Sequence, residues 1–301
     1  MRNIVLIVSV TILTANNIIA QWLDKQTLQS TVLLEKITPE GYMTHGTGFL
    51  MYNYEDQTEI IVVTCAHLLS NKNQISVRVN PDSAILNHLT LTGDRGTLIN
   101  NVILTKNSIR IIVDLTAQNT FIHPKLDIAA FYFNFPNIVK HTDTGIIEIK
   151  TINLKLIPYI SGIQKRESLS LGDEVYFIGF PLGYGVTNYV EPIVRSGSVA
   201  WLPKEYDFFL LDALSYGGSS GSPIFQKVIV GSKPGSLNWS EPKLMGMIVG
   251  HQSMKLENIL NQPDPKELKF EVTDVDLNIG LARCVYTDDI VFTVKELLKQ
   301  K

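Results

Sequence analysis

Ser220 stands in a glycine-rich run, residues 217–223, with the sequence GGSSGSP. Glycines allow unusual backbone dihedral angles and let another molecule approach without meeting a Cβ atom. In a tight turn of this composition, the N–H groups of Gly218 and Ser220 can converge on one oxygen, as the oxyanion of an acyl-transfer intermediate requires. The run therefore predicts Ser220 as a nucleophile, with Gly218 and Ser220 forming the oxyanion hole.

A serine hydroxyl needs a general base to become a good nucleophile, and the base needs a group that orients it. Residues 60–67, IIVVTCAH, form an apolar β-type run, so we expect His67 at the end of a buried strand. Asp127 stands directly before a second apolar run, where its carboxylate is partly shielded from water. The chain thus offers a catalytic triad in the order His67, Asp127, Ser220.

Other interpretations of these residues are less consistent with the whole chain. Residues 217–221 also fit G-x-S-x-G, the nucleophile elbow of α/β-hydrolases, with Ser219 as nucleophile. That fold requires an acid and then a histidine after the serine, on a strand–turn–helix scaffold. The only later histidine is His251, and the flanks of the run are strand-like. His123 lies close to Asp127 and is interpreted as structural. Taken singly, the three triad candidates could be loop, strand-end or turn residues, but their order and flanks favour catalysis.

These segments resemble the chymotrypsin-like serine peptidases, and more closely their HtrA-like bacterial branch than the digestive enzymes. The family motifs T-A-A-H, L-D-I-A and G-x-S-G-[GS]-P are similar to residues 64–67, 126–129 and 218–223. Further short matches in the same order lie at residues 46–50, 178–183, 195–200 and 245–250. The resemblance implies an all-β fold of two six-stranded antiparallel β-barrels with a C-terminal helix. It also implies a serine-type endopeptidase that acts on protein or peptide substrates without a cofactor.

Two positions differ from the digestive enzymes. Ser219 stands where those enzymes have an aspartate that pairs with a newly cut N-terminus, so we do not expect activation through that ion pair. Leu214 stands where trypsin-type enzymes have an acid at the pocket floor, and an apolar floor cannot compensate a buried cation. We therefore predict cleavage after small or medium apolar residues. The resemblance places the rest of the substrate pocket at Ile248, Val249, Gly250 and Cys284.

The distribution of residue types along the chain agrees with this fold. Short runs of β-branched and aromatic residues are separated by Gly, Asn, Asp and Pro, which is typical of an all-β protein. The end of the chain has apolar residues at helical spacing, with acids first and lysines last. The predicted parts are a first barrel at about 29–135 with a long polar excursion between 70 and 119, a connection at about 136–161, a second barrel at about 169–286 and a helix at about 288–300.

Composition and the N-terminus bear on location. The 301 residues are 45% hydrophobic with a formal charge of −3 and no basic tract, so nothing favours nucleic acid as a partner. Residues 1–20 have the form of a signal peptide, with Arg2, an apolar stretch and a cleavage site before Gln21. An uncleaved anchor is the alternative, but the apolar stretch is interrupted and shorter than the about 20 residues of a membrane span. We expect a mature peptidase domain at 21–301, secreted or periplasmic, with no stable membrane insertion.

Cys65 and Cys284 are the only cysteines. A disulfide is possible in an oxidising compartment. The resemblance places Cys65 behind the catalytic histidine and Cys284 in the other barrel, which favours two buried free thiols. Neither cysteine has a metal-ligand spacing and the six histidines are dispersed, so no metal site is expected. Nothing in the sequence specifies an oligomeric state.

A function of another class is a secreted binding protein built on a peptidase scaffold, or a peptidase whose oxyanion loop rests in an inactive conformation. The intact set of His67, Asp127 and Ser220 argues against a pure binder, because such a protein has no need of all three groups.

Overall fold

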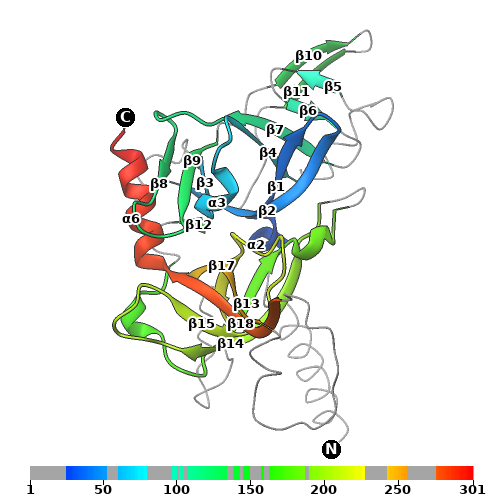
Figure 1. Ribbon diagram of the computed structural model, residues 1–301. Helices are drawn as coiled ribbons and strands as arrows, with labels where there is room; N and C mark the ends of the chain where they lie inside the picture. The colour runs from blue at the N-terminus through cyan, green and yellow to red at the C-terminus, as the bar shows by residue number, and fades with distance from the viewer. Residues whose placement is uncertain are drawn as a thin grey trace, which may run out of the picture.

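The protein has two β-rich lobes, seen one above the other in Figure 1. The structure, a computed structural model, describes residues 25–52, 60–79, 97–99, 102–104, 108–133, 138–142, 145–149, 157–158, 163–186, 190–227, 243–255 and 276–300. The predicted signal peptide, residues 1–20, lies outside the described residues. No helix among the residues that the structure describes is long and apolar enough to cross a membrane.

The first lobe is a ten-stranded sheet that follows the short helix α2 (Lys25–Gln29). The order of nine strands is β5-β6-β7-β4-β1-β2-β3-β9-β8, and β12 (Ile157–Pro158) pairs in parallel with β2. Their bounds are β1 (Thr31–Thr38), β2 (Gly41–Tyr52), β3 (Ile60–Thr64), β4 (Gln74–Val79), β5 (Thr97–Ile99), β6 (Val102–Leu104), β7 (Ile109–Asp114), β8 (Thr120–Ile122) and β9 (Ala129–Tyr132).

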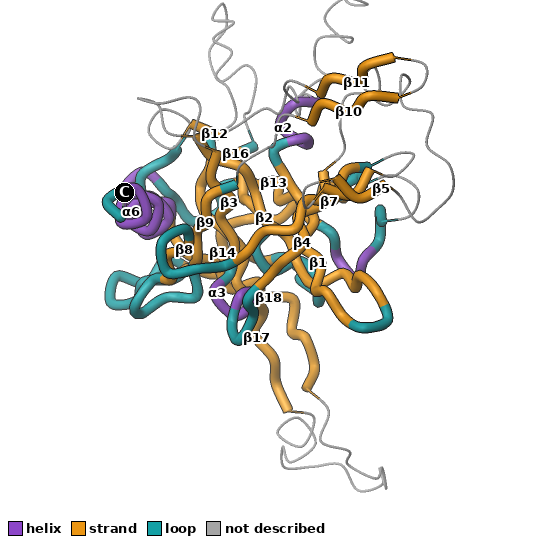
Figure 2. The backbone as a smooth tube through the Cα atoms, turned by 90° about the horizontal axis from the view of Figure 1, so that it is seen from above, coloured by secondary structure: helices purple, strands orange, loops and turns teal. Residues whose placement is uncertain are grey.

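The second lobe is a closed six-stranded barrel in the order β13-β14-β15-β18-β17-β16. The strands are β13 (Glu174–Gly179), β14 (Ile193–Trp201), β15 (Phe209–Asp212), β16 (Pro223–Gln226), β17 (Leu244–Lys255) and β18 (Asp276–Tyr286). Two 3-10 turns, η1 (Arg166–Ser168) and η2 (Pro181–Gly183), flank β13. Figure 2 shows β17 and β18 continuing beyond the barrel as a two-stranded ribbon.

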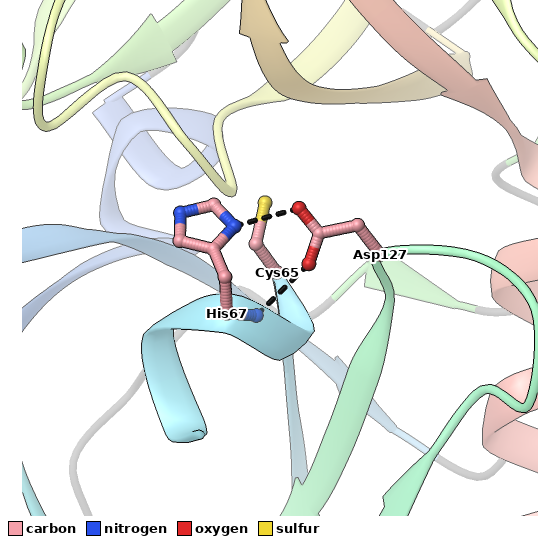
Figure 3. A group of neighbouring side chains, drawn as sticks. All are labelled: Cys65, His67 and Asp127. Carbon is pink, nitrogen blue, oxygen red and sulfur yellow. Dashed lines mark hydrogen bonds and ion pairs between the residues drawn. The ribbon is translucent and has the colours of Figure 1, made fainter. Parts of the chain in front are cut away.

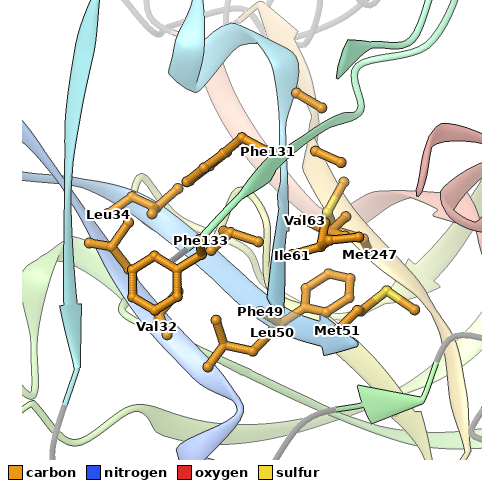
Figure 4. Packing of buried hydrophobic residues seen from close by; sticks show 14 of the residues in the cluster. Val32, Leu34, Phe49, Leu50, Met51, Ile61, Val63, Phe131, Phe133 and Met247 are labelled. Atoms are coloured by element: carbon orange, nitrogen blue, oxygen red, sulfur yellow. The ribbon is translucent and has the colours of Figure 1, made fainter. Parts of the chain in front are cut away.

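The two lobes share one hydrophobic core. Phe49, Ile61 and Phe131 of the first sheet are fully buried, and Met247 from β17 belongs to the same cluster (Figure 4). The second barrel also has an inner cluster of its own. Because apolar area removed from water contributes about 25 cal/mol per Å², a shared core resists separation of the lobes.

The C-terminal helix α6 (Thr287–Leu298) follows β18 directly and packs on β8 and β9 of the first lobe as well as on β17. Its buried face includes Ile290, Val294 and Leu297, which recur at helical spacing. The acids predicted at the start of the helix are Asp288 and Asp289, which lie in its first turn.

The prediction of a chymotrypsin-type all-β fold with a C-terminal helix is confirmed, with one correction. The second lobe is a closed six-stranded barrel, whereas the described part of the first lobe is a half-barrel sheet and not a closed six-stranded barrel. The predicted polar excursion contains β4 to β7, and β5 and β6 extend the sheet past β7. The predicted connection contains a hairpin of β10 (Ile138–Thr142) and β11 (Gly145–Ile149).

Candidate active site

His67 and Asp127 meet because the strands that carry them are neighbours. His67 lies in the one-turn helix α3 (Ala66–Leu69) after β3, and Asp127 precedes β9, which pairs antiparallel with β3. The His67 Nδ1 atom lies 2.6 Å from Asp127 Oδ2, and the His67 backbone N–H donates to Asp127 Oδ1 at 2.9 Å (Figure 3). Two contacts from one residue fix the position of the carboxylate. With Nδ1 bonded to the carboxylate as donor, Nε2 carries the free lone pair.

The Asp127 carboxyl is an ionised group at neutral pH. Partial burial raises its pKa, but the hydrogen bonds from the His67 ring and backbone N–H and the nearby imidazole charge more than offset this, so the pKa lies below its ordinary value. An ionised carboxylate against Nδ1 stabilises a protonated imidazole. The side chains of His67 and Asp127 are 48% and 34% exposed, so the pair is open to solvent.

Ser220 lies in a turn in which two positions require glycine. Gly218 has φ +92° and Gly221 has φ +87°, both in the left-handed region. A Cβ atom on Gly218 would overlap the carbonyl oxygen of Phe180, and one on Gly221 would overlap the carbonyl oxygen of Thr47. Both glycines are therefore required by backbone conformation and by close packing.

The backbone N–H groups of this turn differ in their partners. Those of Ser219, Gly221 and Ser222 donate to the carbonyl oxygens of other residues. Those of Gly218 and Ser220 donate no hydrogen bond within the described part of the chain. These two unpaired donors are the pair that the sequence predicts for an oxyanion hole.

Contacts from outside the turn fix the peptide planes around Gly218. The Leu182 N–H donates to the carbonyl oxygen of Gly217 at 2.6 Å. The Thr47 hydroxyl donates to the carbonyl oxygen of Gly218 at 2.7 Å and accepts from the Phe180 N–H at 3.1 Å. Because N–H and C=O point in opposite directions across a planar trans peptide, the bond to Gly217 directs the Gly218 N–H away from Leu182.

The serine turn of the second lobe lies against the histidine segment of the first. The Ile248 carbonyl oxygen accepts from the Gly221 N–H at 2.8 Å and from Cys65 Sγ at 3.4 Å. One atom therefore contacts both the residue after Ser220 and the residue two before His67. Within the described residues no hydrogen bond joins the Ser220 hydroxyl to His67. Catalytic hydrogen bonds are often long until substrate binds.

The predicted pocket residues fall into two groups. Ile248 and Cys284 are fully buried in the barrel core and face each other across β17 and β18, so they can shape a pocket only from behind. Leu214 is 42% exposed, and Val249 and Gly250 are partly buried.

Sequence reasoning missed two residues that brace this region. Buried Ser215 donates from Oγ to the Gly250 carbonyl oxygen at 3.0 Å, and Asn278 Nδ2 donates to the Ser215 carbonyl oxygen at 2.5 Å. These bonds tie the segment before the serine turn to β17 and β18. The adjacency of Ser215 to the glycine-rich run was a usable signal, whereas Asn278 had none, because it lies 63 residues away in the chain.

The two rival residues have structural contacts. Ser219 is buried, and its Oγ accepts from the Tyr216 N–H at 3.3 Å. His123 Nδ1 accepts from the N–H groups of Lys125 and Leu126, at 3.2 and 2.9 Å, and its ring contacts Phe292 of α6. His123 thus holds the turn that presents Asp127.

Cys65 is the third chemically reactive side chain at the His67–Asp127 pair. Both cysteines are buried and free. The Cys65 Sγ, a ring nitrogen of His67 and a carboxylate oxygen of Asp127 all lie within 4.8 Å of one another (Figure 3). Burial, together with the charge of Asp127, raises the pKa of the Cys65 thiol well above its ordinary value, so it is protonated at neutral pH.

A half-barrel and a closed barrel, with a His–Asp pair on one and a glycine-rich serine turn on the other, define a two-lobed peptidase scaffold. The sequence profile of the trypsin-like peptidase domain matches residues 46–229, and the chain belongs to this family. Solved structures similar to it include HtrA-type protease AlgW with a decapeptide, at 12% identity and TM-score 0.48, covering 91% of this chain and 66% of that one. The same protease with a tripeptide matches at 14% identity and TM-score 0.47, covering 90% and 60%. This chain thus spans less than two thirds of those proteins. A search of curated proteins found no match.

Proposed function

We propose that this trypsin-like peptidase is an exported serine endopeptidase that cleaves peptide bonds through His67, Asp127 and Ser220. The observation that carries the proposal is the His67–Asp127 contact of 2.6 Å beside a turn in which the N–H groups of Gly218 and Ser220 have no partner among the described residues. The family match supports peptides or proteins as substrates.

In the proposed mechanism, His67 Nε2 takes the proton of the Ser220 hydroxyl as the oxygen attacks the peptide carbonyl. The N–H groups of Gly218 and Ser220 donate to the oxygen that becomes negatively charged. His67 then gives its proton to the leaving amine, and Asp127 stabilises the imidazolium in both steps. Water hydrolyses the acyl-enzyme by the same proton transfers in reverse order.

The decisive test is covalent labelling of the folded protein with a fluorophosphonate probe. Ser220→Ala should abolish labelling, whereas Ser219→Ala, which changes the neighbouring buried hydroxyl, should not. Labelling that persists in Ser220→Ala would refute the assignment of the nucleophile.

A second candidate is a peptidase scaffold that rests in an inactive state or serves only for binding. This candidate is consistent with the absence of a hydrogen bond between Ser220 and His67 within the described residues, which an active site without substrate also shows. It predicts a folded wild-type protein that the probe does not label. Labelling that appears only after a peptide is added would identify the conditionally inactive form.

We further propose a preference for small or medium apolar residues before the scissile bond, and export after cleavage at Ala20. Leu214 supports the preference, because an apolar side chain at the pocket offers no charge to a Lys or Arg. A peptide panel in which Arg or Lys gave the highest kcat/KM would refute it. For export, N-terminal sequencing of the secreted protein should begin at Gln21, and recovery of an intact N-terminus would contradict cleavage.

A further inference from the structure

Cys65 occupies an unusual place beside the proposed catalytic pair. It follows β3 directly, its side chain is fully buried, and its Sγ donates to the Ile248 carbonyl oxygen of the other lobe. Figure 3 shows the sulfur next to the gap between the His67 ring and the Asp127 carboxylate. The mechanism of peptide hydrolysis gives this thiol no role.

We propose that Cys65, His67 and Asp127 form a site for one zinc ion, and that the bound ion inhibits the peptidase. The inhibition rests on the proposed function, whereas the binding does not. Zinc takes thiolate sulfur at about 2.3 Å and imidazole nitrogen and carboxylate oxygen at about 2.0–2.2 Å, most often in a tetrahedron. Ligand atoms on such a tetrahedron are separated by roughly 3.3–3.8 Å, as follows from those bond lengths. The three ligand atoms lie within 4.8 Å of one another, and His67 Nδ1 lies 2.6 Å from Asp127 Oδ2. To surround the ion, the ring and the carboxylate would have to separate by about 0.7 Å, and the widest ligand distance would have to close by at most about 1 Å.

The charges of the ligands balance those of the ion. A thiolate and an ionised carboxylate together neutralise Zn²⁺. Neutrality matters because Cys65 is fully buried, and burying a net charge is costly. Coordination deprotonates a thiol outright. The Cys65 proton leaves to water, and in its place the sulfur bonds zinc. A soft thiolate also favours zinc over magnesium or calcium.

The metal would inactivate the base by reversing its tautomer. Zinc at His67 Nδ1 displaces the proton that now points to Asp127, and a neutral imidazole then carries its proton on Nε2. A protonated Nε2 has no lone pair for the Ser220 hydroxyl. The ion would occupy the place of the His67–Asp127 hydrogen bond, and the exposed fractions of these two side chains leave a route from solvent.

Sequence spacing could not reveal this site. Cys65 and His67 are separated by one residue and Asp127 follows 60 residues after His67, which matches no metal motif. The pairing of β3 with β9 brings the three ligands together.

Cobalt(II) provides a direct test, because a thiolate bound to it gives a strong near-ultraviolet charge-transfer absorption. The protein should be reduced Ser220→Ala, so that binding is measured without proteolysis. We expect one cobalt per chain with this absorption, displaced by zinc. Adding Cys65→Ala should abolish the absorption, whereas Cys284→Ala, which removes the other buried thiol, should leave it. Circular dichroism checks folding, and Cys65→Ser replaces Cys65→Ala if the latter does not fold.

Zinc inhibition of the wild-type peptidase supplies the second measurement. Loss of partners outside the first coordination shell weakens metal sites by about 10–100-fold, so loss of the Cys65 ligand should raise the inhibitory zinc concentration at least tenfold. Equal inhibition of wild type and Cys65→Ala would place zinc on His67 Nε2 or elsewhere and overturn the proposal, as would an absent thiolate absorption. Cobalt binding to a protein without peptidase activity would instead refute only the proposed function.

Discussion

Thr47→Val removes one hydroxyl and tests whether this hydroxyl holds the serine turn that carries the proposed oxyanion donors. The Thr47 Oγ1 atom is buried between the lobes, where it donates to the Gly218 carbonyl oxygen and accepts from the Phe180 N–H. Valine has nearly the same shape but can do neither. The substitution leaves one backbone donor and one backbone acceptor without partners.

The magnitude follows from those two groups. An unsatisfied buried donor or acceptor costs about 1–3 kcal/mol. Phe180 is fully buried whereas Gly218 is only partly so, and we therefore expect a loss of about 2–4 kcal/mol in the free energy of unfolding. Release of the Gly218 carbonyl also frees the turn that aims the Gly218 N–H. Deleting one oxyanion donor lowers kcat by about 10²–10³. A Gly218 N–H that is less well positioned should lower kcat by at least tenfold, but by no more than the loss of a whole donor would.

The assay compares Thr47→Val with Thr47→Ser, which keeps the hydroxyl and loses only a methyl group, worth about 1 kcal/mol. Urea denaturation gives the stability, and peptide hydrolysis gives kcat and KM separately. We expect kcat to fall in the valine variant with KM little changed, and the serine variant to retain most of its activity. A valine variant with wild-type kcat would refute the view that Thr47 positions the turn, as would a serine variant as impaired as valine.

Three further predictions test other parts of the site. Gly221→Ala should prevent correct closure of the serine turn, because the added Cβ would overlap the Thr47 carbonyl oxygen, and fluorophosphonate labelling should be lost. Asp127→Asn should lower kcat by about 10³–10⁴ at pH 7. Because the pKa of Asp127 is lowered in the folded state, its contribution to stability is fully present above the unfolded pKa of about 3.9. That contribution is lost as the pH falls through the lower, folded pKa. In denaturation curves, the destabilisation by Asn should therefore vanish at acid pH. Burial, and then the charge of Asp207, raises the pKa of Asp289 to about 6, so its ionised form destabilises the fold at higher pH. Asp289→Asn should therefore raise the thermal midpoint at pH 8, with the gain disappearing as the pH falls from about 6 to about 4; a gain independent of pH would contradict this.

The His67–Asp127 half of the candidate site could be predicted because local sequence carries it. The runs before His67 and after Asp127 are continuously apolar, as buried strands require, and both residues stand at strand ends. The glycines at 218 and 221 likewise mark a turn that needs positive φ. Patterns of this kind can be recognised in the sequence because each depends on the conformation of its own short segment.

Strands β4 and β7 have apolar residues on the face toward the core, and polar residues that pair with one another alternate with these on the other face. The polar residues led to the prediction of a polar excursion. Glu35 of β1 is buried, and its carboxylate accepts from Arg110 Nε at 2.7 Å and from Ser76 Oγ at 3.0 Å. Arg78 of β4 lies 3.6 Å from the same carboxylate. Buried charges are tolerated when paired. The pairing partners lie 41 to 75 residues from Glu35, so the segment looks like a polar excursion in the sequence.

The geometry of the candidate active site depends on contacts between the two lobes. The first lobe donates from the Thr47 N–H to the Ser220 carbonyl oxygen at 2.9 Å and from Cys65 Sγ to the Ile248 carbonyl oxygen at 3.4 Å. In the opposite direction, the Phe180 N–H of the second lobe donates to Thr47 Oγ1 at 3.1 Å. Met247, next to Ile248, packs in the core of the first lobe. Hydrogen bonds weaken steeply once donor and acceptor move beyond their normal range, so a shift of about 1 Å between the lobes would break several of these bonds together. The shared core therefore sets the distance between the proposed base on one lobe and the proposed nucleophile on the other, which no single strand can do.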